Sequence, residues 1–252
     1  MFLLAFKLIL APLLIALATW IGRRWGHGVS GWIAALPLTS APVSFIFAIQ
    51  YGTPFAAQAA IGTLAGIISV SAFCFVYCRL ARWHHWLVCI IFAVIAFFSM
   101  TALLNALTLT LIPVYVIVVC VLMLTLKFIP KPKTDLVKMT PPKWDLYARM
   151  LTAIVFILIV TYAAEGLGPQ LSGLVTPFPI FATILAVFAH EQRGASAAIL
   201  ALRGILTGLF AFATFFLVVG ATLANLPIAV TYLLAIVAAL GVNVFTLRFV
   251  RR

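Results

Sequence analysis

Few residues of this chain could do chemistry, and most of them gather where one apolar run ends and the next begins. His190 and Glu191 close the first of these runs, and because histidine titrates near neutral pH the pair could relay protons. Arg203 lies about two turns inside the next run, where an unpaired cation costs about 3 kcal/mol or more. We therefore predict a charge network that couples protons or holds an anionic group of a substrate, with His190, Glu191 and Gln192 as the expected partners of Arg203. Its members are Glu165, His190, Glu191, Gln192, Arg193 and Arg203.

Each of these residues also has a plainer interpretation. The long side chain of Arg203 could reach back to the membrane interface. His190 could be an ordinary interfacial residue, and Glu165 could simply end its apolar run.

Prolines interrupt two apolar runs at related positions, and one of the two is the run that His190 and Glu191 close. Proline removes a backbone donor and clashes with the preceding turn, so each run should open near the middle of a membrane. The freed carbonyls then need partners, because hydrocarbon offers none. Helix breaks at equivalent places in two inverted halves are typical of a transporter's binding site, whereas a packed kink without a ligand is the alternative. The predicted substrate-binding residues are Pro37, Thr39, Ser40, Pro42, Thr176, Pro177 and Pro179.

Enzyme, cofactor and metal chemistry find little support in the sequence. The chain has four acidic residues, and Asp135 and Asp145 are assigned to the linker between two spans, so acid–base catalysis has few candidates. Adjacent His84 and His85 cannot share one helix face, which argues against a metal site. The four cysteines lie inside apolar runs and are interpreted as small buried hydrophobes. We predict no enzyme activity, no cofactor and no metal.

Composition places the whole chain in a membrane. Two-thirds of its residues are hydrophobic (66%) and only 8% are charged, which no soluble domain resembles. We predict an all-α, polytopic integral membrane bundle of about nine transmembrane helices. The predicted spans are 2–21, 31–49, 55–78, 86–104, 107–127, 148–165, 171–189, 196–219 and 227–247.

An internal repeat relates the two halves of the chain. An offset of 142 places Ser30 on Ser172, Pro37 on Pro179 and Gln50 on Gln192, and the register also places Lys7 on Arg149. Because one odd span separates two four-span units, the units should enter the membrane from opposite sides, as a 4+1+4 inverted-topology repeat with Pro-broken helices. The predicted divisions are unit 1 (1–105), a connector span and basic loop (106–143) and unit 2 (144–252). The glycine pairs that should pack helices closely, or form a moving interface, are Gly62, Gly66, Gly204 and Gly208.

Basic residues segregate to one side of this predicted topology. The faces after the odd spans carry all basic residues except Lys7 and Arg203, which lie within spans. The positive-inside rule then places the N-terminus outside and the C-terminus in the cytoplasm of a bacterial inner membrane. The net charge of +12 is explained by topology and by anionic lipid headgroups rather than by nucleic acid. The fourteen residues are Arg23, Arg24, Arg79, Arg82, Lys127, Lys131, Lys133, Lys138, Lys143, Arg149, Arg193, Arg248, Arg251 and Arg252.

One stretch suggests a family. The sequence GLVTPFPIFATILAVFAHEQRGASAAILALRGILTG, with its SG-x5-P start, proline turn and short polar end before a small-residue helix, resembles the GlpM family of small bacterial inner-membrane proteins. The first half carries a more divergent copy, with ALPLTSAP at the proline turn. The resemblance implies an inner-membrane location and two such four-span units fused in one chain, and implies that single-unit relatives pair as antiparallel dimers.

Two functions from different classes fit these features. The first is a secondary carrier that moves a small solute, which Arg203 would favour as anionic, or a lipid-linked headgroup, by alternating access. The second is an accessory membrane protein for envelope or polysaccharide biogenesis that transports nothing. A duplicated chain needs no second copy to complete a two-fold site, so we expect a monomer.

Overall fold

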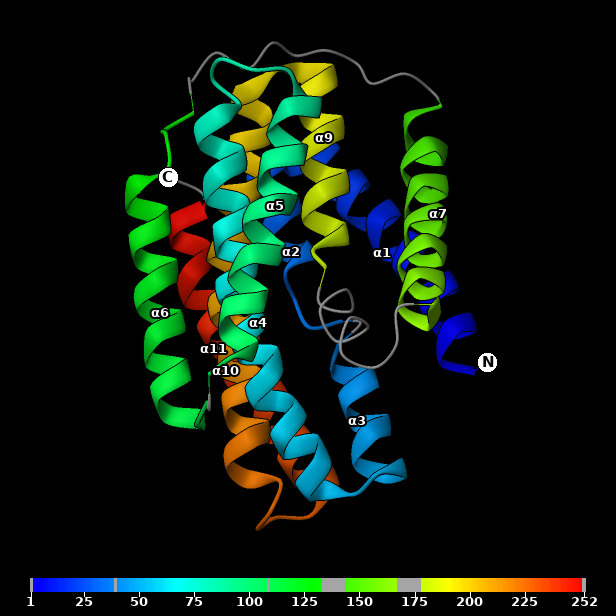
Figure 1. The fold of residues 1–252 in the computed structure, drawn as a ribbon, viewed down its shortest axis with the longest axis vertical. Coiled ribbons are helices and arrows are strands. Elements are labelled where there is room, and N and C mark those ends of the chain that lie inside the picture. Colours follow the sequence, from blue (N-terminus) through cyan, green and yellow to red (C-terminus); the bar gives the residue numbers. More distant parts are fainter. Residues whose placement is uncertain (1, 39, 108, 133–143, 167–177, 251–252) are drawn as a thin grey trace.

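The computed structural model describes residues 2–38, 40–107, 109–132, 144–166 and 178–250, and every regular element in these ranges is an α-helix (Figure 1). The predicted all-α class is therefore confirmed. The helices are α1 (Phe2–Trp25), α2 (His27–Ala34), α3 (Ser40–Gln50), α4 (Thr53–Leu80), α5 (Trp86–Asn105), α6 (Leu111–Phe128), α7 (Asp145–Gly166), α9 (Ile180–Arg193), α10 (Ala195–Thr222) and α11 (Ile228–Val250).

Five of these helices are long and apolar enough to cross a membrane. They are α4, α5, α6, α10 and α11, and each coincides with one of the predicted spans to within a few residues. The predicted span over 31–49 is divided instead between α2 and α3, and the described residues between these helices, 35–38, include Pro37.

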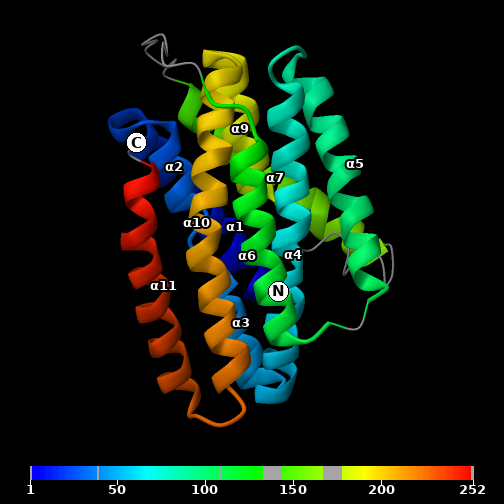
Figure 2. The same cartoon turned by 90° about the vertical axis from the view of Figure 1, so that its left-hand side faces the viewer.

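Helices α4 and α10 form the centre of the bundle and pack against each other in opposite directions (Figure 1). Their shared interior includes Leu64, Phe73, Leu206 and Phe215, all of them fully buried. Helices α5, α6 and α11 lie around this centre (Figure 2). They carry many exposed large apolar side chains, among them Phe92 of α5. Because such wide apolar faces are favourable only against hydrocarbon, the fold is that of a multi-pass helical membrane protein.

Glycines allow α2 to lie directly on α10. A Cβ added at Gly204 would come within 1.9 Å of the carbonyl oxygen of Gly28, and one added at Gly31 within 2.0 Å of that of Ala201. Gly208 faces the carbonyl of Trp32 in the same way, at 2.5 Å. The predicted packing role of Gly204 and Gly208 is therefore present, and it fixes α2 against the most buried helix.

The equivalent glycines of α4, Gly62 and Gly66, differ from those of α10. Gly62 is exposed, and a Cβ added there would meet no atom of the described chain within 4 Å. Its predicted role in close helix packing is wrong for the part of the molecule that the structure describes. Gly66 lies one turn further along α4 and is half-buried.

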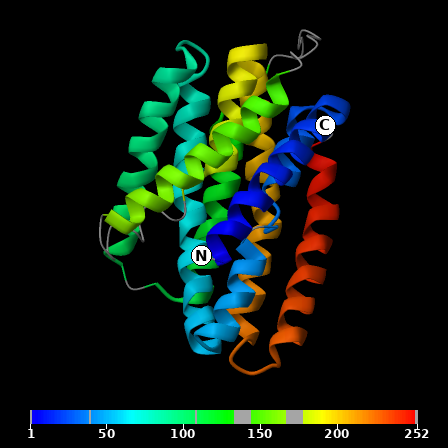
Figure 3. The same cartoon turned by 90° about the vertical axis from the view of Figure 1, so that its right-hand side faces the viewer.

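Helices α1 and α7 lie against each other on one side of the bundle and run in opposite directions (Figure 3). Helix α9 contacts α7 and α10, so it joins this pair to the centre. The last turns of α1, α4, α6 and α9 all carry basic residues, and all of these turns lie in the upper half of the bundle in Figure 1. Cations at helix C-termini are favoured by the helix dipole, so this end of the molecule is strongly basic.

Candidate functional site: a buried arginine–aspartate cluster

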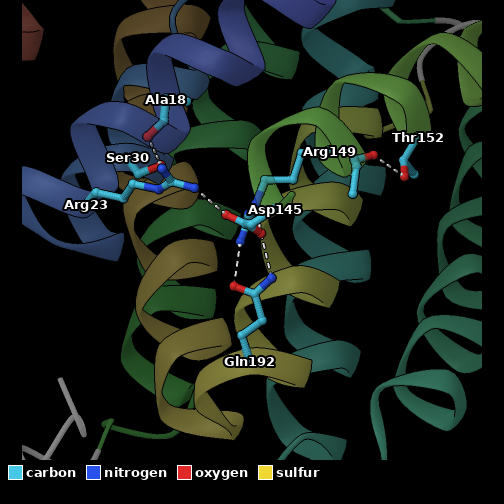
Figure 4. A network of polar contacts seen from close by, with 8 residues as sticks. Ala18, Arg23, Ser30, Asp145, Arg149, Thr152 and Gln192 are labelled. Atoms are coloured by element: carbon cyan, nitrogen blue, oxygen red, sulfur yellow. Dashed lines mark hydrogen bonds and ion pairs between the residues drawn. The ribbon is translucent and has the colours of Figure 1, made fainter. Parts of the chain in front are cut away.

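The most polar interior site lies at this basic end, where α1, α2, α7 and α9 converge. Gly26, with φ at 95°, turns the chain between α1 and α2, which places Arg23 just before the turn and His27 just after it. A hydrogen bond of 2.6 Å from the Ser30 hydroxyl to the carbonyl of Ala18 holds the two helices together (Figure 4). The turn therefore presents residues of both helices to the beginning of α7.

Asp145 is the centre of the cluster. It lies in the first turn of α7 and is only 1% exposed. One of its carboxylate oxygens, Oδ1, accepts from Arg149 Nε at 2.8 Å and from Gln192 Nε2 at 2.5 Å. The other, Oδ2, accepts from Arg23 Nη2 at 3.0 Å, so this one side chain joins α1, α7 and α9 (Figure 4).

Arg149 is the buried cation of the cluster, with 5% of its surface exposed. Its guanidinium lies 4.7 Å from the ring centroid of Phe188 on α9, and its Nη2 donates to Gln192 Oε1 at 3.4 Å. An arginine stacked on an aromatic ring and paired with a carboxylate satisfies its charge away from water. Removing one partner of such a buried pair typically costs about 3–5 kcal/mol, because the other charge is left uncompensated.

A small cavity of about 20 Å³ borders the cluster, and that volume has room for about one water molecule. Arg23, Asp145, Arg149 and Gln192 line one part of it. The remaining polar lining comes from Thr19, His27, Ser30 and Arg193.

Several polar groups of this cavity have no partner among the described residues. Thr19 is 6% exposed and its hydroxyl oxygen makes no hydrogen bond, and the same holds for the buried Nε2 atom of His27. The Arg193 guanidinium has no hydrogen bond or ion pair with the part of the chain that the structure describes. All three groups can act as hydrogen-bond donors, so the cavity is suited to a ligand that accepts hydrogen bonds.

Histidine 27 stays neutral at physiological pH. It lies between the first two predicted spans, and burial, reinforced by the charges of Arg193 and Arg149, lowers the pKa of His27 to about 4. Three arginines and one aspartate therefore give the cavity an excess of two positive charges. Such a site can bind an anion.

Only two of the predicted network residues, Gln192 and Arg193, line this cavity. Glu191 is exposed and faces His85, with 3.4 Å between Oε2 and Nε2, and a polar contact so accessible to solvent contributes little to stability. His190 meets Tyr77 instead, with 3.3 Å between Nδ1 and the phenol oxygen. These residues therefore do not form one network with Arg203.

Arg203 has a different partner from the predicted one. Its Nη1 donates to the carbonyl oxygen of Leu126 at 3.2 Å, in the last turn of α6. That carbonyl is one of the unsatisfied groups at a helix C-terminus, which a cation stabilises. The prediction that Arg203 pairs with the end of α9 is wrong in the described structure. Glu165 belongs to the last turn of α7, but its side chain lies outside the described residues.

The predicted substrate residues are only partly described. Pro37 is buried between α2 and α3, Ser40 and Pro42 are half-buried in the first turn of α3, and Pro179 precedes α9. Thr39, Thr176 and Pro177 lie outside the described residues. A cavity of about 10 Å³ near Pro37 is lined by apolar side chains, among them Leu36 and Phe181. Substrate binding at these prolines stays a prediction.

An aromatic cluster surrounds Phe178, the residue directly before Pro179. Phe178 contacts the rings of Phe97 and Phe156, with centroids 5.5 and 5.4 Å apart, and it also contacts Phe73 and Phe98. The interior beside Pro179 is thus filled by aromatic side chains. Within the described residues no group of three or more His, Cys, Asp or Glu side chains could hold a metal ion.

The centre of the site is not among the predicted site residues. Hydropathy places Asp145 in the linker and Arg149 on the basic side of the topology, whereas both belong to the first two turns of α7. Two signals were present in the sequence. The pair has the i, i+4 spacing of a helical ion pair, and the repeat places Lys7 on Arg149 and Gln50 on Gln192.

Comparison of the chain with models of protein families, with curated proteins and with solved structures found no match. The resemblance to the GlpM family therefore stays a prediction.

Proposed function

We propose that this protein is a secondary carrier that moves a small anionic solute across the bacterial inner membrane by alternating access. The observation that carries the proposal is the arginine–aspartate cluster. It lies at one end of a bundle in which helices related by the sequence repeat run in opposite directions. A positively charged cavity beside a repeated helical frame fits alternating access, in which two inverted units rock against each other and open a path to one side at a time.

The proposed inverted repeat is argued from the helix bounds. Moving both bounds of α4 by the sequence offset of 142 residues gives the bounds of α10, and the first residue of α5 moves onto the first residue of α11. The same offset moves α1 onto α7 and α3 onto α9 to within two residues at each end. In Figure 1 the two members of each pair run in opposite directions, and α6 has no counterpart, as a connector requires.

The basic end of the bundle would face the cytoplasm. The residues of that end include Arg24, Arg82 and Lys127, each of which lies over a neighbouring aromatic ring. Basic and aromatic side chains together favour the headgroup region of the cytoplasmic leaflet. The proposed cluster would then control access from the cytoplasm.

In this mechanism the Asp145 contacts hold the cytoplasmic end closed. Asp145 ties α7 to Arg23 of α1 and to Gln192 of α9, so a path along these helices opens only when the contacts separate. Helices α4 and α10 stay packed as the fixed part, because their shared interior is fully buried. The helix interruption around Pro37 gives the chain a place to bend without disturbing that interior.

Two-sided labelling of Ser40 tests the proposal. Ser40→Cys is introduced into a variant without native cysteines. Oriented proteoliposomes of this variant are then treated with a membrane-impermeant thiol reagent, added to one side or to the other. We expect labelling from both sides, because alternating access opens the interruption to each face in turn. Ser71→Cys, at a buried position of α4, is the matched control and should stay unlabelled. Complete protection of Ser40→Cys from both sides would overturn the proposal and favour the non-transporting accessory role.

A further inference from the structure

We propose that Asp145 holds the place of a substrate carboxylate, and that the cluster binds a small organic carboxylate in exchange for the Asp145 side chain. The substrate class rests on the proposed transport function, whereas the binding site itself does not.

The Asp145 carboxylate is bound as a carboxylate ligand would be. Both of its oxygens are used, and the three donors come from Arg149, Arg23 and Gln192 on three different helices. Paired nitrogen donors around a planar two-oxygen group are the geometry by which proteins recognise carboxylates. The chain therefore already contains a built carboxylate site, occupied by its own side chain.

The surroundings of that carboxylate contain more hydrogen-bond donors and more positive charge than Asp145 alone can satisfy. Thr19 and His27 line the adjoining cavity and each has a buried polar atom without a partner, and Arg193 adds a charge that has no counter-ion among the described residues. Burying such donors without acceptors costs free energy, and a second anion would recover it. The cavity by itself has room for about one water molecule, so a solute of several atoms fits only if Asp145 moves aside.

Exchange of the two carboxylates would couple binding to opening. While Asp145 occupies the arginines, α1 and α9 are tied to the beginning of α7. When a solute carboxylate takes its place, the arginines keep their counter-ion, but α1 and α9 are then held to Arg149 of α7 by a solute that can leave rather than by a side chain of α7. Binding would thus weaken the closed end without leaving the arginines unpaired.

Chemical rescue of Asp145→Ala tests this exchange. The variant removes the internal carboxylate and leaves the arginines, so its Tm in detergent should fall by about 10 °C. Sodium formate at about 100 mM should then raise the Tm by about 5 °C more than sodium chloride at equal ionic strength. The double variant Asp145→Ala/Arg149→Gln should lose this rescue. Glu191→Ala, which removes an exposed carboxylate, should show neither the fall nor the rescue.

The other outcomes are equally informative. If Asp145→Ala does not fold, Asp145→Asn, which keeps the side-chain shape, should show the same preference for formate over chloride. Equal effects of formate and chloride on both variants would overturn the proposal. Inorganic phosphate stabilising more than formate would overturn the carboxylate class in favour of a phosphate group. Since the assay measures binding alone, rescue together with a fully protected Ser40→Cys would keep the site and remove the transport function.

Discussion

The junctions α3–α4 and α9–α10 have the same backbone conformation but differ in their side chains. Each passes through a glycine with positive φ, at 87° for Gly52 and 79° for Gly194, and each leads into a helix of 28 residues. The residues before the first glycine are Gln50 and Tyr51, and those before the second are Gln192 and Arg193. The same turn is therefore built twice, but only one copy carries a charge.

The neighbours of the two junctions differ accordingly. Tyr51 is exposed and contacts the rings of Phe47 and Phe55, which gives the first junction an apolar surface. Gln192 instead donates to Asp145 in the interior. Glycine and apolar spacing therefore specify the frame, whereas a few substitutions on that frame specify the site.

Removing the buried cation Arg149 should cause the largest loss in the free energy of unfolding. Arg149→Met leaves Asp145 in the interior without its main counter-ion, and we expect a loss of about 3–5 kcal/mol in the free energy of unfolding. Denaturant unfolding in detergent micelles measures it. Arg79→Met, at an exposed position of α4, is the control and should change stability by less than about 0.5 kcal/mol. Equal losses in the two variants would show that the cluster contributes nothing specific.

A smaller effect should separate the two glycine pairs. Gly204→Ala places a methyl group against the backbone of α2, and we expect a loss of about 3 kcal/mol. Gly62→Ala meets open space and should raise stability by about 1 kcal/mol, because alanine favours the helix. The same micelle unfolding assay compares them. A loss of stability in Gly62→Ala would show that another segment packs on this face of α4.

Much of this frame could be predicted from the sequence, because it rests on long apolar runs. Helices α4, α5, α6, α10 and α11 were located from hydrophobicity alone, and the glycine spacing of α10 indicated its close packing. The cluster could not be found in this way, since α7 begins with polar residues that lie before its apolar run. The partner of Arg203 depends on how α10 is rotated about its axis, and that rotation is set by the contacts of Gly204 and Gly208 with α2.

The two junction glycines should lose the same amount of stability when they are replaced by alanine. Both adopt a positive φ with extended ψ, a region that only glycine occupies readily, so Gly52→Ala and Gly194→Ala should each cost about 2 kcal/mol. Thermal unfolding in detergent measures both. Gly241→Ala, inside α11 without positive φ and with open space for a methyl group, should not destabilise. Clearly unequal losses at Gly52 and Gly194 would contradict the idea that one backbone serves two junctions.

The smallest effect should distinguish the two glutamines that the repeat aligns. Gln192→Ala removes one of the three donors to Asp145 but leaves both arginines, so we expect a loss of about 1.5 kcal/mol in the free energy of unfolding. Gln50→Ala, at an exposed position, should change it by less than about 0.5 kcal/mol. When Gln192→Ala is combined with Arg149→Met, the loss should be smaller than the sum of the two single losses, because Gln192 and Arg149 both donate to Asp145. Additive losses there would mean that Gln192 acts apart from the cluster, and the chemical difference between the junctions would then lie with Arg193 alone.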